Sequence, residues 1–201
     1  MPRFSVLHDI SRALQSQIIG ALASAPDVSF DADDTTIVLQ PPSEGLGTDV
    51  QAALYLYHIA IDPHLRNQQR LPDGADPSLF IRPPLPLQLR YLFVPLGEVE
   101  ADNQLLLGRV LQHFHDAPTF RPAPGSPLAV NRGGVPETLR VRVEFAGFEA
   151  LSQLWSALSR PFRLSAGFMV DIAALDSAAG SQAIPRVAQT ATTTGRKEVA
   201  G

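Results

Sequence analysis

The sequence contains no cysteine, and its single lysine, Lys197, stands against an otherwise all-arginine set of 16 basic residues. The absence of cysteine excludes disulfides, thiolate zinc sites and thiol catalysis. No stretch approaches the roughly 18 apolar residues that a membrane-spanning helix needs. The charged start of the chain lacks the apolar core of a signal peptide. These absences predict a protein with no membrane span.

The overall composition is that of a folded protein. Hydrophobic residues make up 45% of the 201 residues, which is enough for one sizeable core and excludes a wholly disordered chain. The net charge is -4, and residues 24–49 hold six acids and no base. Nucleic-acid binding needs lysine and arginine clustered on one face. The sequence therefore predicts no nucleic-acid partner.

Hydrophobic periodicity predicts an α+β protein. Apolar residues recur at helical spacing in three segments, residues 5–23, 103–114 and 149–158. Strand-type patterns occupy four others, residues 52–61, 85–93, 139–145 and 164–172. The first of these strands is apolar on both faces, as expected of a central strand, and the second alternates, as expected of a half-buried one. This order favours a mixed, mainly antiparallel sheet faced by two or three helices.

Loops and termini complete the prediction. Residues 62–78 read as a long polar loop, and Asp102 or Asn103 is suited to cap the helix that follows the second strand. From residue 177 the large apolar residues thin out. We therefore expect one domain over residues 1–176 and a flexible C-terminal tail over residues 177–201.

No motif in the sequence carries recognisable catalytic chemistry. His113 and His115 are two positions apart and point to opposite sides of a helix, so they cannot share one metal ion. His58 stands in an apolar strand, where a buried, hydrogen-bonded histidine is expected, and no partner acid stands beside it. A small hydrolase using His58 or His115 is the weakest hypothesis. The sequence predicts no catalytic residue, no cofactor and no metal site.

Five stretches, in order along the chain, are similar to one known family. They are Asp9-Ile-Ser-Arg-Ala-Leu14, Leu54-Tyr-Leu-Tyr57 with Arg66-Asn67, Pro83-Pro-Leu-Pro-Leu-Gln-Leu-Arg-Tyr-Leu92, Leu106-Leu-Gly-Arg-Val110 with His115-Asp-Ala-Pro118, and Leu154-Trp-Ser-Ala-Leu158 with Pro161-Phe-Arg-Leu-Ser165. With them the chain resembles the tube-cap or tail-terminator proteins of extracellular contractile injection systems, which are phage-tail-like particles of the antifeeding-prophage type.

The resemblance implies a non-enzymatic structural subunit with a tail-terminator-like fold. Such subunits form a hexameric ring at the end of the particle distal to the baseplate, and their partners are the terminal tube and sheath subunits. The expected location is the bacterial cytoplasm during assembly, then a released or cell-associated particle. A baseplate or tube-adaptor protein, or a phage tail-completion protein, is the alternative.

Four residues are the candidate interface: Arg66, Asn67, Trp155 and Arg163. The two arginines stand next to apolar residues, which suits either a solvated guanidinium with a packed stem or an ion pair across an interface. Tryptophan is favoured both in cores and in interfaces. The sequence leaves both alternatives open.

Overall fold

The computed structural model describes residues 4–25, 30–42, 46–65, 68–73, 76, 78–122, 138–144, 147–177 and 179–183. Its helices are α1 (Val6–Ala23), α2 (Glu100–Asp116) and α3 (Phe148–Ala157). Its strands are β1 (Ile37–Val38), β2 (Ala52–Ile61), β3 (Leu71–Pro72), β4 (Leu79–Ile81), β5 (Leu85–Pro95), β6 (Thr119–Phe120), β7 (Leu139–Glu144), β8 (Ala166–Leu175) and β9 (Gln182–Ala183). The predicted helices and long strands are all present, with shifted ends.

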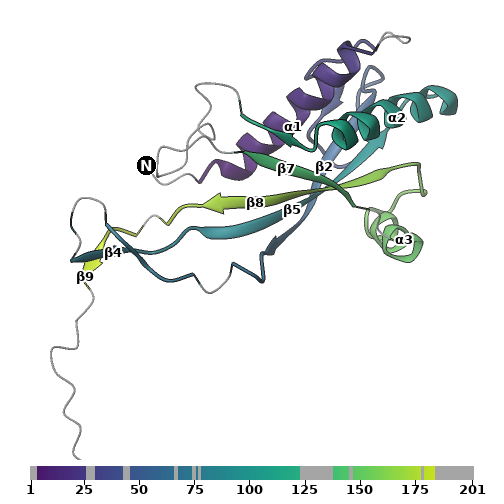
Figure 1. The fold of residues 1–201 in the computed structure, drawn as a ribbon. Coiled ribbons are helices and arrows are strands. Elements are labelled where there is room, and N and C mark those ends of the chain that lie inside the picture. The colour runs from purple at the N-terminus through teal and green to yellow at the C-terminus, as the bar shows by residue number, and fades with distance from the viewer. Residues whose placement is uncertain are drawn as a thin grey trace, which may run out of the picture.

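The main sheet has six strands in the order β1-β2-β5-β8-β7-β6. Only the short pair β1 and β2 is parallel, and every other neighbouring pair is antiparallel. Figure 1 shows the three long strands β2, β5 and β8 running together as a twisted ribbon. The prediction of an α+β fold with a mixed, mainly antiparallel sheet is confirmed.

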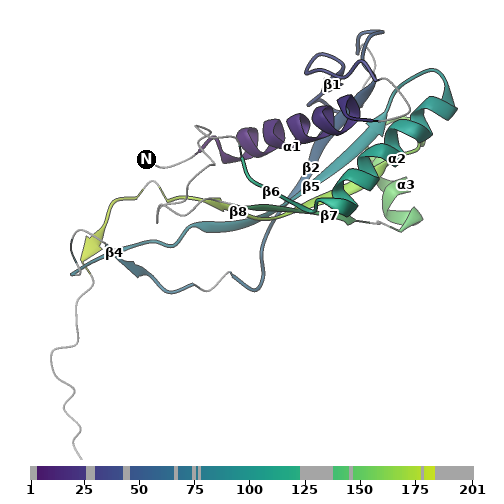
Figure 2. The same ribbon diagram turned by 45° about the horizontal axis from the view of Figure 1, so that its top comes forward.

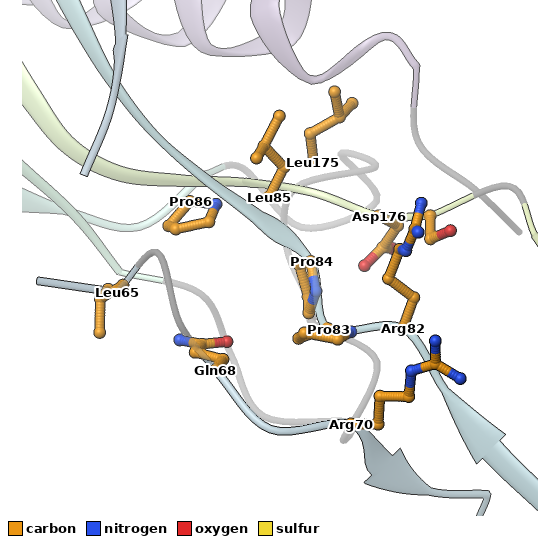
Figure 3. A pocket seen from close by; sticks show the side chains of 11 residues that line it. Leu65, Gln68, Arg70, Arg82, Pro83, Pro84, Leu85, Pro86, Leu175 and Asp176 are labelled. Atoms are coloured by element: carbon orange, nitrogen blue, oxygen red, sulfur yellow. The ribbon is translucent and has the colours of Figure 1, made fainter. Parts of the chain in front are cut away.

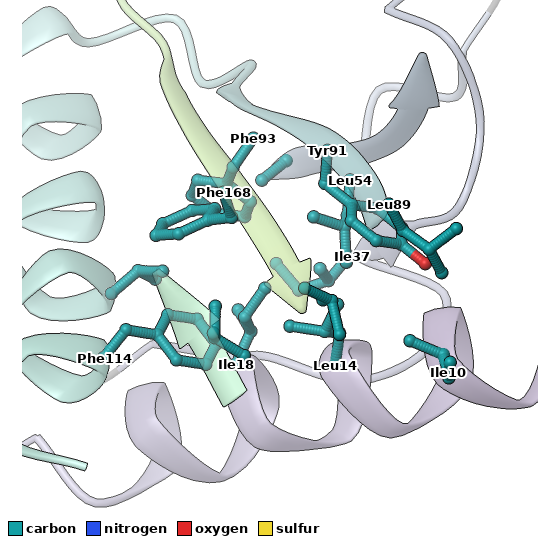
Figure 4. Close-up of a cluster of buried hydrophobic side chains, with 14 of the residues drawn as sticks. Ile10, Leu14, Ile18, Ile37, Leu54, Leu89, Tyr91, Phe93, Phe114 and Phe168 are labelled. Carbon is teal, nitrogen blue, oxygen red and sulfur yellow. The ribbon is translucent and has the colours of Figure 1, made fainter. Parts of the chain in front are cut away.

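Helices α1 and α2 cover one face of this sheet (Figures 1 and 2). The apolar residues at helical spacing in α1 are buried, apart from the half-buried Ala13, and Gln15 is buried with them: Val6, Ile10, Leu14, Ile18 and Leu22. The principal core lies between these two helices and the sheet (Figure 4). Within it the rings of Phe114 and Phe168 are in contact, with centroids 5.0 Å apart. Its fully buried large side chains include Ile10, Leu14, Ile18, Leu54, Leu89, Tyr91, Phe93, Phe114 and Phe168.

Helix α3 packs on the opposite face, at one end of the sheet. Its anchor, Trp155, joins Leu92 and Val94 of β5 in a second buried cluster. Because neighbouring side chains of a strand point to opposite faces, β5 is buried on both faces from Tyr91 to Pro95. The prediction of a half-buried strand is therefore wrong for this half of β5, which is a central strand covered by α2 on one side and α3 on the other.

Strand β2 is less buried than predicted. It is buried at its start, but its second half is open, with Ile59 and Ile61 each about half exposed at 45% and 46%. The reason is its position next to the sheet edge, where β1 pairs only with Ala52 and Ala53. The predicted burial on both faces is wrong from His58 onward, where His58, Ile59 and Ile61 are exposed, whereas residues 55–57 are half-buried.

The predicted loop over residues 62–78 contains part of a second, three-stranded sheet, β3-β4-β9. Leu79 of β4 pairs with Ala183 of β9, and the Ser181 hydroxyl donates a hydrogen bond to the Asp73 carboxylate. Figures 1 and 2 place β4 at the end of the molecule away from α3. The expected tail boundary at residue 176 thus precedes a strand, and residues 184–201 lie outside the described part of the chain.

The start of α2 also differs from the prediction. The helix begins at Glu100 after the extended residue Val99, and no side chain caps it. Asn103, expected as a cap, is instead buried within the first turn, and its side-chain amide donates to the Gly97 carbonyl oxygen at 3.0 Å. A Cβ on Gly97 would lie 2.9 Å from the Asn103 side-chain oxygen, so a larger residue at this position would force the Asn103 side chain to shift.

Candidate functional site

The structure brings two of the four predicted interface residues to one place. Trp155 on α3 and Arg163 in the segment after it line the same surface cavity. Arg66 and Asn67 lie outside the described residues, so their prediction stays a prediction. The shared cavity makes the surroundings of α3 the candidate interface, and we call this surface the α3 corner. Its members are Pro42, Leu96, Phe148, Trp155, Arg160, Pro161, Phe162, Arg163 and Leu164.

Burial of Trp155 fixes α3 to the sheet. The side chain is only 2% exposed and packs against β5, with Leu151, Leu154 and Leu158 packed around the same cluster. Its indole nitrogen is buried and has no hydrogen-bond partner among the described residues. The indole therefore holds α3 against the sheet through apolar packing. Of the two roles that the sequence left open for Trp155, the structure places nearly all of the side chain in the core.

The segment after α3 is held by a turn in an unusual conformation. Ser159 has φ 54°, in the left-handed region that non-glycine residues rarely adopt. Its N–H donates to the Ser156 carbonyl at 3.0 Å, and the next N–H, of Arg160, donates to the Trp155 carbonyl at 3.2 Å. These two bonds form a Schellman motif, normally built with glycine at this position. The turn directs the chain from the helix end across the cavity.

The cavity itself is small and carries positive charge. Its volume is about 290 Å³, and it is lined by Pro42, Leu96, Trp155, Arg160, Pro161 and Arg163. The Arg160 guanidinium donates to the Pro42 carbonyl at 3.4 Å, and that of Arg163 donates to the Gly97 carbonyl at 3.3 Å. None of the described residues that line the cavity is an acid. The site thus combines apolar walls with two guanidinium groups and suits an anionic group next to an apolar one.

Exposed aromatic rings extend the corner beyond the cavity. Phe148 is 75% exposed and Phe162 50% exposed, and their ring centroids are 5.5 Å apart. Phe162 also contacts Trp155, with a centroid distance of 6.2 Å. Aromatic residues and arginine are enriched in protein interfaces. Phe148 and Arg160 were not among the interface residues predicted from the sequence, although a phenylalanine just before the predicted helix and an arginine beside Pro161 could have indicated them.

Other surfaces of the molecule offer less defined chemistry. A cavity of about 540 Å³ near the second sheet is lined by apolar residues, including Leu85 and Leu175, and by Arg70 and Arg82 (Figure 3). Within the described part of the chain, no group of three histidines or acids is placed to hold a metal ion. None of its helices has the length and apolar character to cross a membrane.

His58 and His115, the histidines considered for catalysis from the sequence, lie on different elements. His58 is exposed on β2, and His115 is exposed on the last turn of α2. Partial burial and the nearby positive charge of Arg109 lower the pKa of His113, while Asp116 opposes that shift. The ring of His113 contacts Phe114 rather than a nucleophile or acid, with centroids 5.1 Å apart.

Comparison with known proteins gives the family. The family model named Pvc16 N-terminal domain matches residues 9–189. The chain belongs to this family. No curated protein matches it. The match covers both sheets, α2, α3, the α3 corner and α1 from its fourth residue onward.

Two solved structures are similar to this Pvc16 N-terminal domain. One is a cryo-EM structure of an extracellular contractile injection system, the PVC sheath/tube terminator in the extended state, with a TM-score of 0.60 at 19% identity over 96% of this chain. The other is the tube-terminating cap of the anti-feeding prophage, with a TM-score of 0.55 at 17% identity over 93% of this chain. The chain spans 65% and 61% of the length of these two proteins. The expected tail-terminator-like fold is confirmed.

Proposed function

We propose that the protein is a structural subunit that caps the inner tube and contractile sheath of a phage-tail-like contractile injection system. The main support for the proposal is that the family match and the similarity to terminator structures both extend over nearly the whole chain. Of the two similar structures, one is a sheath/tube terminator and the other is a tube-terminating cap. The role is non-enzymatic, because it requires binding surfaces rather than reacting groups.

The proposal includes the partners and the assembly. Its partners are the terminal tube and sheath subunits and further copies of the chain in a hexameric ring. Sixfold closure requires a head-to-tail contact between two different surfaces of each subunit. Assembly takes place in the bacterial cytoplasm, before the subunit becomes part of the particle. Residues 1–176 form the capping domain in this proposal, and residues 177–201 form a tail whose first part pairs with β4 through β9. Arg66 and Asn67 belong to the proposed interface of the capping domain.

Deletion of the gene tests the function directly. We expect particles without this subunit to show tubes and sheaths of uncontrolled length by negative-stain electron microscopy, and a plasmid-borne copy to restore uniform lengths. A gold label on an added C-terminal tag is expected at the end distal to the baseplate. Particles of normal length in the deletion strain, or a label on the baseplate, would refute the proposal.

A further inference from the structure

One edge of the main sheet has no neighbouring strand along most of its length. The outermost strand there, β1, pairs only with Ala52 and Ala53 at the start of β2. Beyond them, no strand among the described residues lies on the outer side of β2. We call the last four residues of this strand, 58–61, the β2 edge. An unpaired strand edge is a template on which another strand can form.

The hydrogen bonds to β5 show which backbone groups of the β2 edge point outward. The N–H of Asp62, directly after β2, donates to the Pro86 carbonyl oxygen of β5 at 3.0 Å. Backbone groups of successive strand residues point to opposite sides. Those of Ala60 therefore point toward β5, and those of Ile59 and Ile61 point away from it. No hydrogen bond joins these outward groups to another described residue.

The side chains of the same two residues extend the core to the edge of the sheet. Ile59 lies opposite Leu89 of β5, and Ile61 lies opposite Leu87. Residues opposite each other in a sheet have their side chains on the same face. Both leucines are buried in the principal core, whereas both isoleucines are about half exposed. A further strand beside β2, apolar on this face, would bury them.

The β2 edge has few of the features that protect a free edge. Strand β2 contains no charged residue and no proline, although lysine and proline are common devices against unwanted pairing. Its one irregularity is the register shift between Leu56 and His58. Residues 58–61 follow that shift and keep a regular register with β5. This composition is typical of a strand that is covered in an assembly.

The described part of a second copy offers no matching strand except β2 itself. At the opposite edge of the sheet, β7 alternates with the charged residues Arg140, Arg142 and Glu144. Its Val141 N–H already donates to the Pro118 carbonyl at 2.8 Å. The strands of the second sheet have only two or three residues. Pairing of β2 with β2 of another copy is a two-fold contact, which does not build a ring. These features favour a different protein as the partner.

We propose that the β2 edge binds an extended segment of a different protein, which joins the main sheet as a strand next to β2. The segment exchanges backbone hydrogen bonds with Ile59 and Ile61, and apolar side chains at its alternate positions cover the two isoleucines. The inference rests on the proposed function, in which tube and sheath subunits adjoin this chain and one of them supplies the strand.

Hydrogen exchange in the purified full-length chain and in intact particles tests the added strand. In the free chain, the amides of Ile59 and Ile61 should exchange rapidly, while that of Ala60 is protected by β5. In particles all three should be protected, and the exchange of the two isoleucine amides should slow by about a hundredfold or more. Only a strand on the outer side of β2 removes this alternation. Mass spectrometry with fragmentation of the quenched peptides resolves single amides.

A proline variant tests the same hydrogen bond. Ile59→Pro removes an N–H that has no partner within the chain, so the purified variant should keep its circular dichroism. It should join particles about tenfold less well or worse, because the incoming strand loses an N–H donor. The matched control, Ile59→Val, keeps the N–H and a branched apolar side chain and should join normally. If the proline variant does not fold, the exchange measurement still decides, because it needs no variant.

Crosslinking identifies the partner. With a photoreactive benzoylphenylalanine in place of Ile61, irradiated particles should yield a crosslink to an extended segment of a tube or sheath subunit with apolar residues at alternate positions. Rapid exchange of Ile59 and Ile61 in particles, normal incorporation of Ile59→Pro, or crosslinks only to another copy of this chain would each overturn the inference. Those results leave the capping role to the deletion experiment. A protected β2 edge in particles whose length does not depend on the gene would instead support the added strand and refute the cap.

Discussion

Truncation of Trp155 to alanine is expected to destabilise the protein strongly, because this side chain attaches α3 to β5. The indole is 2% exposed. An aromatic side chain buries about 150–250 Å², which at about 25 cal/mol per Å² corresponds to roughly 4–6 kcal/mol. Alanine retains part of that area, so Trp155→Ala is expected to lower the free energy of unfolding by about 3–5 kcal/mol.

The expected loss has a location as well as a size. The second buried cluster consists of Trp155 with Leu92 and Val94, surrounded by partly buried leucines, and it has few other large groups to hold α3 in place. Amide hydrogen exchange in Trp155→Ala should therefore accelerate in α3 more than in α1 or α2. Trp155→Phe keeps a ring in the cluster, and because the indole nitrogen has no partner to lose among the described residues, it should cost only about 1 kcal/mol.

Urea unfolding followed by circular dichroism measures these differences. Phe148→Ala is the matched control, since Phe148 lies on the same helix but is 75% exposed, and its free energy of unfolding should change by no more than about 0.5 kcal/mol. In the unmodified chain, the fluorescence of this single tryptophan reports the same transition. A Trp155→Ala protein as stable as the unmodified chain would refute the packing argument and move Trp155 to the interface alone.

Three further predictions concern the turn, the sheet and pH. Ser159→Gly should raise the free energy of unfolding by about 0.5–1 kcal/mol in urea, because glycine adopts the positive φ of that turn without steric cost. Gly167→Ala should lower it by about 1–3 kcal/mol and reduce the melting temperature, because the new Cβ would lie 2.7 Å from the Glu144 backbone carbonyl oxygen across β7 and β8. Burial raises the pKa of Tyr91 to about 12, partly opposed by the Ser11 hydroxyl. Tyr91 ionises near pH 10 in the unfolded chain but only near pH 12 in the folded protein. The stabilisation from the protonated tyrosine is therefore fully present below pH 10, and the free energy of unfolding falls by about 2–3 kcal/mol as the pH rises from 10 toward 12. Tyr91→Phe should flatten that part of the stability curve, and an equally steep loss in this variant would contradict the assignment.

The helices and long strands, and the lack of a recognisable catalytic motif, could be read from the amino-acid pattern without the structure. Helix α1 follows from apolar residues such as Ile10, Leu14 and Ile18, because their spacing places them on one side of any helix whatever it packs against. The alternation from Leu139 to Val143 likewise predicted β7. Such patterns are local, so the chain needs no long-range contact to reveal them.

Which faces of the sheet are covered, and which distant residues come into contact, depends on how the elements pack together. The pattern of β5 gave no sign that α3 would cover Leu92 and Val94, because that depends on where a helix more than 50 residues later is placed. Pairing across the sheet and the left-handed turn at Ser159 brought Trp155, Arg163 and Leu96 around one cavity. These contacts join separate segments of the chain. The periodic pattern of one segment says nothing of which strand it pairs with or of which charges its neighbours bring to the surface.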